Sequence, residues 1–516
     1  VNDPANTITK ILTTGTQDEV IAAVAAAGYN DTVNINVSGT VELKKQLYND
    51  KGATIHLKGM GSGACIKPDR NGLFSNATVM DTSQTKNYLL SFTVNQIYQS
   101  GVNVANTKDD KPFTIENLTL EGTNNSKKCA LLEVDNHKIT STNVVYQKGS
   151  MATSIPNIWF QGESIDIKGC QFLNNEGPTN AGQNTGCLYV NTTSYNNKAT
   201  GNVTITGTTF SGNKGHSGGA LYAYGDKTYV SIDSTCKFVN NYAGQRGGAI
   251  LSHATIMVDS ATFTGNKSGQ WGGTVYVSAN EDNNNNKHYG TVVLNNVQIT
   301  DSTAAASGGG VYIADNGALF LCGDSKVSGN TVPENGKNSD NNVFVQSVNS
   351  RVVCVNGFVP EANKVGISTS NPYSGKDVVI SPKNVDEAAP NYKLAADHIQ
   401  GYVRNYDATT EDANVKSFKY DGEGFTIVDD PTKDGMMMLQ FNSNTSDVIF
   451  DFNLPGQKAV TYLNQAIGTS VNVPTDVTST TKGNVTYTFK GWFTEAEGGQ
   501  QITTPTVTTV AGTKIY

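Results

Sequence analysis

A short motif that recurs through the middle of the chain constrains its fold more than any other feature. A phenylalanine is followed three positions later by an asparagine at four places, and a degenerate copy begins with a valine: Phe172, Phe210, Phe238, Phe263 and Val327. Pairs of adjacent glycines begin at Gly218, Gly247, Gly272 and Gly308, after a single forerunner at Gly186. The gaps between successive pairs are 29, 25 and 36 residues. A fixed motif at variable spacing is typical of a solenoid whose coils carry loops of different length.

The length and period of the repeats favour a right-handed parallel β-helix over the other solenoid folds. Helical and leucine-rich repeats need segments with a helical period, which are absent here, and propeller blades need about 40 residues at steadier spacing. A coil of three short strands needs roughly 20–30 residues. Stacked coils place each phenylalanine about 4.8 Å from the next. Each asparagine then sits at a corner, where it can bond the backbone and adopt a left-handed conformation, and each glycine pair allows a bend with positive φ.

The sequence therefore predicts an all-β chain in three parts. Residues 1–45 form an N-terminal cap, residues 46–440 the β-helix, and residues 441–516 a small β-grasp-like module. Within the cap, residues 16–28 are expected to form a short amphipathic helix, with Thr16 as its N-cap and Gly28 closing it. Such a helix could cover the open end of the sheet stack, where exposed ladder groups would otherwise recruit other chains.

Charge and composition narrow the classes of function. The formal net charge is −8 and only 16% of residues are charged, so the chain lacks the basic face that nucleic-acid binding requires. No run of about 18 apolar residues exists, and we expect no membrane insertion. No signal peptide is visible, and the first residues read like the start of a processed chain. Seven scattered cysteines show no metal-ligand spacing, so no metal or cofactor is expected and buried thiols are favoured, although pairing in an oxidising compartment stays open.

The central repeats resemble those of chlamydial polymorphic outer-membrane proteins, whose signatures are GGAI or GGAL and FxxN. The segments GGAL at Gly218 and GGAI at Gly247 match fully, and GGTV at Gly272 and GGGV at Gly308 are near matches. The resemblance covers roughly residues 165–330. Similar repeats occur in adhesin-like surface proteins of bacteria and archaea. The membrane barrel that ends the chlamydial proteins is missing from this sequence, so that mode of anchoring is not implied.

The C-terminal segment resembles a Listeria–Bacteroides repeat, also called the internalin B-type repeat. The motif consists of Tyr487, Phe489, the pair Gly491-Trp492 and the pair Gly498-Gly499. The resemblance implies a small β-grasp-like module of a secreted or cell-wall attached protein. Such modules often occur in tandem, so it also implies that the repeat is truncated and that further repeats or a wall anchor follow.

The strand after each glycine pair predicts a row of tyrosines on the outer surface. The second position of each strand is aliphatic and should point inward, so the next position should point outward. That outward position holds Tyr189, Tyr222, Leu251, Tyr276 and Tyr312. An exposed row of tyrosines could bind a glycan by stacking or dock a protein, whereas a covering loop would make it part of the packing.

The corner before the glycines adds two further candidate ligand-binding residues. If the coils stack in register, Arg246 lies over Trp271 in a cation–π pair. This pair could serve corner stability alone, or contact a ligand if one face of Trp271 is free. In the second case Trp271→Ala is expected to abolish glycan binding and leave the melting temperature nearly unchanged.

A weaker catalytic candidate comes from aligning the segments VSID and IMVD. This alignment stacks Asp233 on Asp259, with Lys168 and Thr206 in the same column. Paired carboxylates serve glycoside hydrolysis when they lie about 5–9.5 Å apart. Alternatively, Asp233 and Asp259 each begin a solvated turn, as an aspartate before a serine often does.

These observations favour an extracellular, secreted or wall-attached adhesin-like protein. One face of its β-helix would bind a glycan, or a protein on a host or neighbouring cell, by many weak contacts. The alternatives are a β-helical carbohydrate-active enzyme, either a polysaccharide lyase or a glycoside hydrolase, and a structural spacer.

Overall fold

The computed structural model describes most of the solenoid and of the C-terminal module. The described residues are 5–69, 88–93, 112–123, 129–135, 138–151, 155–180, 186–192, 201–281, 287–288, 290–347, 350–354, 358–380, 415–433, 435–442, 445–454, 458–466, 469–475, 477, 480–507 and 513–516.

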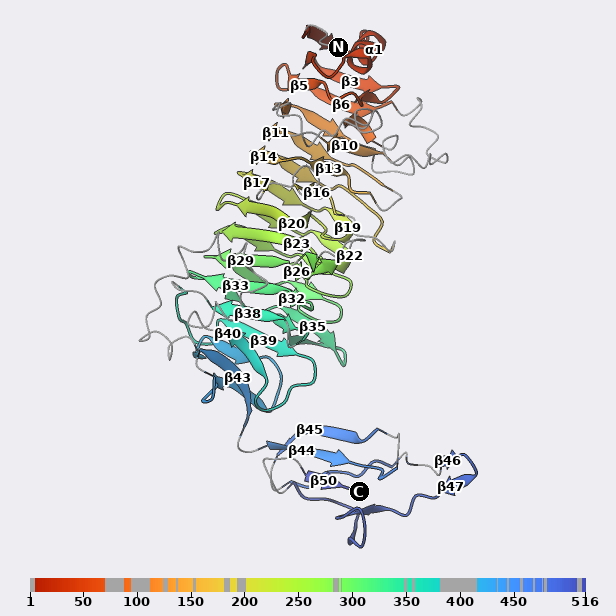
Figure 1. The fold of residues 1–516 in the computed structure, drawn as a ribbon, viewed down its shortest axis with the longest axis vertical. Helices are drawn as coiled ribbons and strands as arrows, with labels where there is room; N and C mark the ends of the chain where they lie inside the picture. The colour runs from red at the N-terminus through yellow and green to blue at the C-terminus, as the bar shows by residue number, and fades with distance from the viewer. Residues whose placement is uncertain are drawn as a thin grey trace.

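The chain winds into a parallel β-helix, as the repeats predict. Its strands stack from the helix α1 (Gln17–Ala26) at the N-terminal end to the hairpin of β42 (Phe425–Asp429) and β43 (Met436–Phe441), which pairs with β40 in antiparallel fashion (Figure 1). Successive coils pair in parallel, so most coils contribute one strand to each of three long sheets that surround one apolar core.

Sheet 1 begins with the first strand of the described chain. It runs through β1 (Thr7–Leu12), β2 (Thr32–Val37), β5 (Thr54–Gly59), β8 (Pro112–Glu116), β11 (Lys138–Thr142), β14 (Ser164–Lys168), β17 (Gly201–Thr206), the second half of β20 (Leu221–Ile232), the second half of β23 (Ile250–Asp259), β29 (Thr291–Asn295), β33 (Ala318–Cys322), β38 (Arg351–Cys354) and β40 (Asp377–Ile380).

Sheet 2 carries the phenylalanine motif. It runs through β3 (Thr40–Leu43), β6 (Cys65–Pro68), β9 (Thr119–Glu121), β12 (Val145–Gln147), β15 (Gln171–Leu173), β18 (Thr209–Ser211), β21 (Lys237–Val239), β24 (Thr262–Thr264), β30 (Gln298–Thr300), β34 (Lys326–Val327), β39 (Val365–Thr369) and β41 (Phe418–Tyr420).

Sheet 3 follows the glycine pairs. It runs through β4 (Leu47–Asn49), β7 (Tyr88–Phe92), β10 (Ala130–Asp135), β13 (Ile158–Gln161), β16 (Leu188–Asn191), the first halves of β20 and β23, β26 (Val275–Val277), β32 (Val311–Ile313) and β37 (Val343–Val345).

A smaller sheet 4 lies between sheets 2 and 3 along the chain. It contains β19 (Lys214–Ser217), β22 (Tyr242–Arg246), β25 (Lys267–Ser268), β31 (Thr303–Ala304), β35 (Thr331–Glu334) and β36 (Lys337–Asp340). A separate short hairpin consists of β27 (Asn280–Glu281) and β28 (Lys287–His288).

The predicted aromatic ladder is confirmed. Phe210, Phe238 and Phe263 are directly paired in successive coils and are at most 2% exposed. Their ring centroids are 4.7 and 4.9 Å apart, and the planes are nearly parallel. One further coil, which the motif search missed, places Ile299 on Phe263 and Val327 on Ile299. The recurring residues therefore do lie above one another in one continuous solenoid.

The asparagines of the motif form a second buried ladder. The Oδ1 atom of Asn241 accepts hydrogen bonds from the backbone N–H and the Nδ2 group of Asn213, at 3.1 and 3.0 Å. Asn266 does the same for Asn241. The expectation of left-handed asparagines at these positions is wrong by one residue. Positive φ falls on the preceding position, as in Asn240 (52°) and Gly265 (63°), and this turns the chain so that the next asparagine points inward.

The two glycines of each pair have different roles. Gly247 has a φ of 62°, in the left-handed region that side chains rarely adopt. Gly248 instead lies so close to the next coil that an added Cβ would meet the carbonyl oxygen of Gly273 at 2.0 Å. The first glycine therefore makes the bend, and the second lets the coils stack.

The predicted N-terminal helix is present, but its ends are bonded in an unexpected way. The Thr16 hydroxyl donates to the Ile11 carbonyl at 2.7 Å and does not cap the helix. At the other end Asn49 Nδ2 donates to the carbonyls of Val24 and Ala27, at 2.8 and 2.9 Å. A side chain that is distant in sequence thus closes the C-terminal end of the helix, where Gly28 was expected to do so, by adding hydrogen bonds to its last carbonyls.

The C-terminal module has its own small core. β44 (Thr445–Phe450) pairs with β45 (Val460–Ala466) in antiparallel fashion and with β50 (Thr513–Ile515) in parallel. Two short hairpins complete it: β46 (Thr480–Lys482) with β47 (Val485–Tyr487), and β48 (Trp492–Phe493) with β49 (Gln501–Ile502). Trp492 is 3% exposed and packs on Phe450 with a centroid distance of 4.9 Å, which makes it a core residue.

Candidate functional site

The tyrosine row forms on the outer side of sheet 3. Tyr189 pairs with Tyr222, and Tyr276 with Tyr312, while Leu251 fills the step between Tyr222 and Tyr276. These side chains form a cluster separate from the core, so they point outward as alternation predicts. Tyr276 and Tyr312 stack with centroids 5.2 Å apart and planes inclined by 6°.

Of the two alternatives for this row, an exposed surface or covered packing, the structure shows the covered one. Tyr189, Tyr222, Tyr276 and Tyr312 are only 5–9% exposed. The rings cover one another, and side chains from the adjacent corner cover them further. Tyr189 accepts a hydrogen bond from Asn191 at 3.0 Å, and Tyr222 bonds His253 at 3.1 Å. Burial raises the pKa of Tyr312 to about 12, which is consistent with rings shielded from water. The row therefore serves mainly as packing.

The corner pair is confirmed and also covers the row. The Arg246 guanidinium lies 5.7 Å from the centroid of Trp271 and 5.3 Å from that of Tyr276. Trp271 in turn lies 6.0 Å from Tyr312. Both Arg246 and Trp271 are half-buried. Because Trp271 packs against the row, we now expect Trp271→Ala to lower the melting temperature, which differs from the prediction made from the sequence.

Arg246 has unused hydrogen-bonding capacity at this corner. Its Nε atom is buried and has no hydrogen-bond partner. None of the ion pairs among the described residues involves Arg246. A guanidinium presents five donors in a fixed planar fork that matches a carboxylate or a sulfate. We call Arg246, Trp271, Tyr276 and Tyr312 the corner site.

The predicted pair of aspartates does not have the properties of a catalytic dyad. Asp233 and Asp259 lie at equivalent ends of neighbouring strands, as the alignment predicts. Asp233, however, accepts hydrogen bonds from its own turn, from Thr235 and from Gly207 of the coil before. Burial opposes ionisation, but these bonds outweigh it and lower the pKa of Asp233, so it is a poor proton donor. Asp259 bonds Ser260 and Asn295. Both residues stabilise turns.

A different carboxyl pair lies on the same outer face as the tyrosine row. Glu133 pairs with Trp159, whose ring is tilted against Tyr189 with a centroid distance of 4.5 Å, so Glu133 continues the row toward the N-terminus. Asp135 is two residues further along β10 on the same side. Burial, followed by the charge of Glu133, raises the pKa of Asp135 to about 7, and burial also raises that of Glu133. Sequence reasoning missed this pair because it lies outside the glycine repeats. The available signal was the alternation of acidic and apolar residues in the segment ALLEVD, which places both carboxyl groups on the outer side of the strand.

Other features of the described residues add less. The C-terminal module has an open hollow of about 540 Å³ beside the exposed rings of Tyr487 and Phe489. The seven cysteines are free thiols, and six of them are buried. Within the described residues no group of three histidine, cysteine or acidic side chains could hold a metal ion. No helix among them is long and apolar enough to cross a bilayer.

Comparison with known proteins gives no match. No family model, no curated protein and no solved structure is significantly similar to this chain.

Proposed function

We propose that this protein is an extracellular, adhesin-like surface protein that binds a glycan at the corner site. The observation that carries the proposal is the half-buried Arg246, whose guanidinium lies across Trp271 and Tyr276 with a buried Nε that has no partner. An attachment outside the cell is supported by the adhesin-type repeats and by the residues of the internalin-type motif around Trp492.

The chemistry of the corner site favours a sugar that carries an acidic group. A carboxylate or sulfate would accept hydrogen bonds from the terminal N–H groups of Arg246, because the Nε atom itself is buried. Such charge-assisted hydrogen bonds are roughly twice as strong as neutral ones. The accessible part of Trp271 would contact the ring carbons. Aromatic rings and arginine are the residue types that dominate binding energy at recognition surfaces.

A glycan array with acidic and neutral members tests this proposal. The wild-type chain is expected to bind acidic glycans, and Arg246→Gln to lose at least tenfold in affinity. Lys237→Gln is the matched control, because it removes one exposed positive charge from the strand of the same coil in sheet 2. Equal binding by wild type and Arg246→Gln, or no binding of any acidic glycan by the wild type, would contradict the proposal.

A second candidate function, hydrolysis of a polysaccharide, is favoured by Glu133 and Asp135. Alternate residues on one side of a strand lie about 7 Å apart at Cβ, within the range of about 5–9.5 Å between carboxylates in glycoside hydrolases. A raised pKa near neutrality keeps Asp135 partly protonated, as a general acid must be. Release of reducing ends that is lost in both Glu133→Gln and Asp135→Asn would support it. Release that persists in both variants would exclude this pair.

A further inference from the structure

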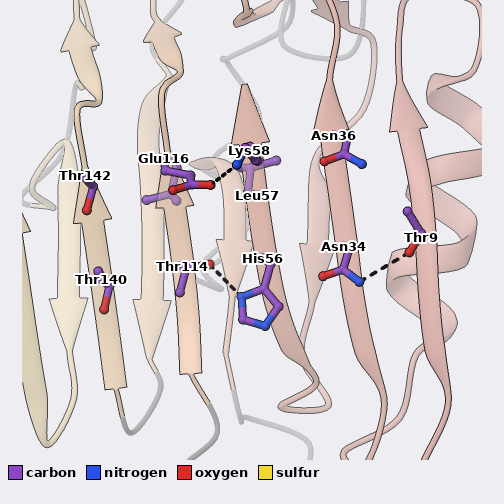
Figure 2. A pocket seen from close by; sticks show the side chains of 11 residues that line it. Thr9, Asn34, Asn36, His56, Leu57, Lys58, Thr114, Glu116, Thr140 and Thr142 are labelled. Carbon is purple, nitrogen blue, oxygen red and sulfur yellow. Dashed lines mark hydrogen bonds and ion pairs between the residues drawn. The ribbon is translucent and has the colours of Figure 1, made fainter. Parts of the chain in front are cut away.

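A polar groove crosses the outer surface of sheet 1 near the N-terminal end. It has a volume of about 500 Å³ and is bordered by two rows of side chains that the strand register aligns across five coils (Figure 2). The first row contains Thr9, Asn34, His56, Thr114 and Thr140, and the second contains Asn36, Lys58, Glu116 and Thr142. Since coils repeat about every 4.8 Å, five coils span about 19 Å.

The groove offers hydrogen-bonding groups that the protein itself does not use. The side chains of Asn36, Thr140 and Thr142 make no hydrogen bond with any other described residue. Between them, His56 Nδ1 bonds the Thr114 hydroxyl at 2.7 Å. Because hydroxyl groups both donate and accept, and amides provide both a donor and an acceptor, the two rows present mixed hydrogen-bonding partners along their length.

The charges in the groove cancel. Lys58 Nζ lies 2.8 Å from Glu116 Oε1 across neighbouring strands, as the dashed line in Figure 2 shows. Burial lowers the pKa of His56, an effect that the Glu116 charge partly opposes, so the imidazole is neutral at pH 7. The groove therefore gives no net attraction to a polyanion or a polycation, in contrast to the corner site with its unpaired guanidinium.

One apolar side chain stands at the N-terminal end of the second row. Ile11 pairs with Asn36 in the register and is 59% exposed, one of the most exposed large apolar side chains of the described residues. A ligand with hydroxyl groups at its edges and carbon–hydrogen faces would satisfy both the polar rows and Ile11. Sugar rings have this combination.

We propose that the groove binds an uncharged polysaccharide that lies along the axis of the solenoid, across β1, β2, β5, β8 and β11. This site is independent of the corner site and recognises a different class of glycan. Its mechanism is a series of hydrogen bonds from successive coils, each weak, which together hold an extended chain.

Affinity electrophoresis in gels that contain dextran, xyloglucan, galactomannan or the acidic polygalacturonate tests this proposal. At least one neutral polysaccharide is expected to retard the wild-type chain. The triple variant Asn36→Ala, Thr140→Ala, Thr142→Ala is expected to weaken that binding at least tenfold. The matched control is Thr204→Ala, Thr206→Ala, which removes hydroxyls from the same two rows on β17, two coils beyond Thr140 and Thr142 and outside the groove.

A second variant tests the balance of charge. Glu116→Gln leaves Lys58 unpaired. The comparison is made in the Arg246→Gln background, which removes the corner site. There the chain with Glu116→Gln is expected to be retarded by polygalacturonate, and the chain with the native Glu116 is not. Arg246→Gln alone should leave neutral-polysaccharide binding unchanged, which separates failure of this site from failure of the corner site. The proposal is overturned if no neutral polysaccharide retards the wild type, or if the triple variant binds like its control.

Discussion

The asparagine ladder provides the sharpest test of how the coils hold together. Asn241 is 1% exposed, and its side chain takes part in four hydrogen bonds, with Asn213, Phe210 and Asn266. In Asn241→Ala the buried backbone N–H of Asn213 loses its acceptor. An unsatisfied buried donor costs about 1–3 kcal/mol, and each of the other lost hydrogen bonds about 1 kcal/mol. We expect the free energy of unfolding to fall by about 4–6 kcal/mol.

Urea denaturation together with hydrogen exchange measures this effect. Coils of a solenoid contact only their neighbours, so exchange should accelerate most in the coils of Asn213 and Asn266. Asn202→Ala is the control, because Asn202 is exposed on β17 and its side chain makes no hydrogen bond with the other described residues. A loss below about 1 kcal/mol relative to this control, with uniform exchange, would refute the reasoning, because buried donors without partners cost more than that.

Three further substitutions test other parts of the structure. Phe238→Ala removes one fully buried ring from the aromatic ladder, and denaturation should show a loss of about 3–5 kcal/mol. Trp271→Ala removes a half-buried ring, and the same measurement should show about 2 kcal/mol, less than a buried ring costs; an unchanged stability would show that the corner is not packed. Asn330 of the motif bonds Asn342, and the carboxylate of Asp421 accepts hydrogen bonds from Asn342 at 2.7 and 3.0 Å. Burial raises the pKa of Asp421 above the ordinary 3.8. The folded state therefore takes up the proton more readily, so the wild type should lose stability relative to Asp421→Asn as pH rises through the raised pKa, with no further change below pH 3.8; parallel pH profiles of the two chains would contradict this.

The path of the coils could be predicted because its causes are local. A phenylalanine that must be buried, a glycine that must adopt positive φ and an asparagine at a corner each act within a few residues. The same reasoning missed the coil of Ile299 because an isoleucine and Ser302 replace the phenylalanine and the asparagine. It also placed the left-handed residue one position late, since the turn is set by Asn240 and Gly265 while their successors form the ladder.

What each surface can bind was decided by the tertiary structure. Alternation along a strand determines the side to which Tyr276 points, and the sequence alone determined that. Whether water reaches the ring depends on Arg246, which comes from the preceding coil and lies over Tyr276. Trp271 covers the row in the same way across a coil boundary, because it packs on Tyr312 of the next coil. The polar groove likewise exists only because strands from Thr9 to Thr142 are brought side by side. The side of the sheet to which a side chain points is a property of one strand. The exposure of that side chain and the shape of the surface around it depend on which distant segments pack together.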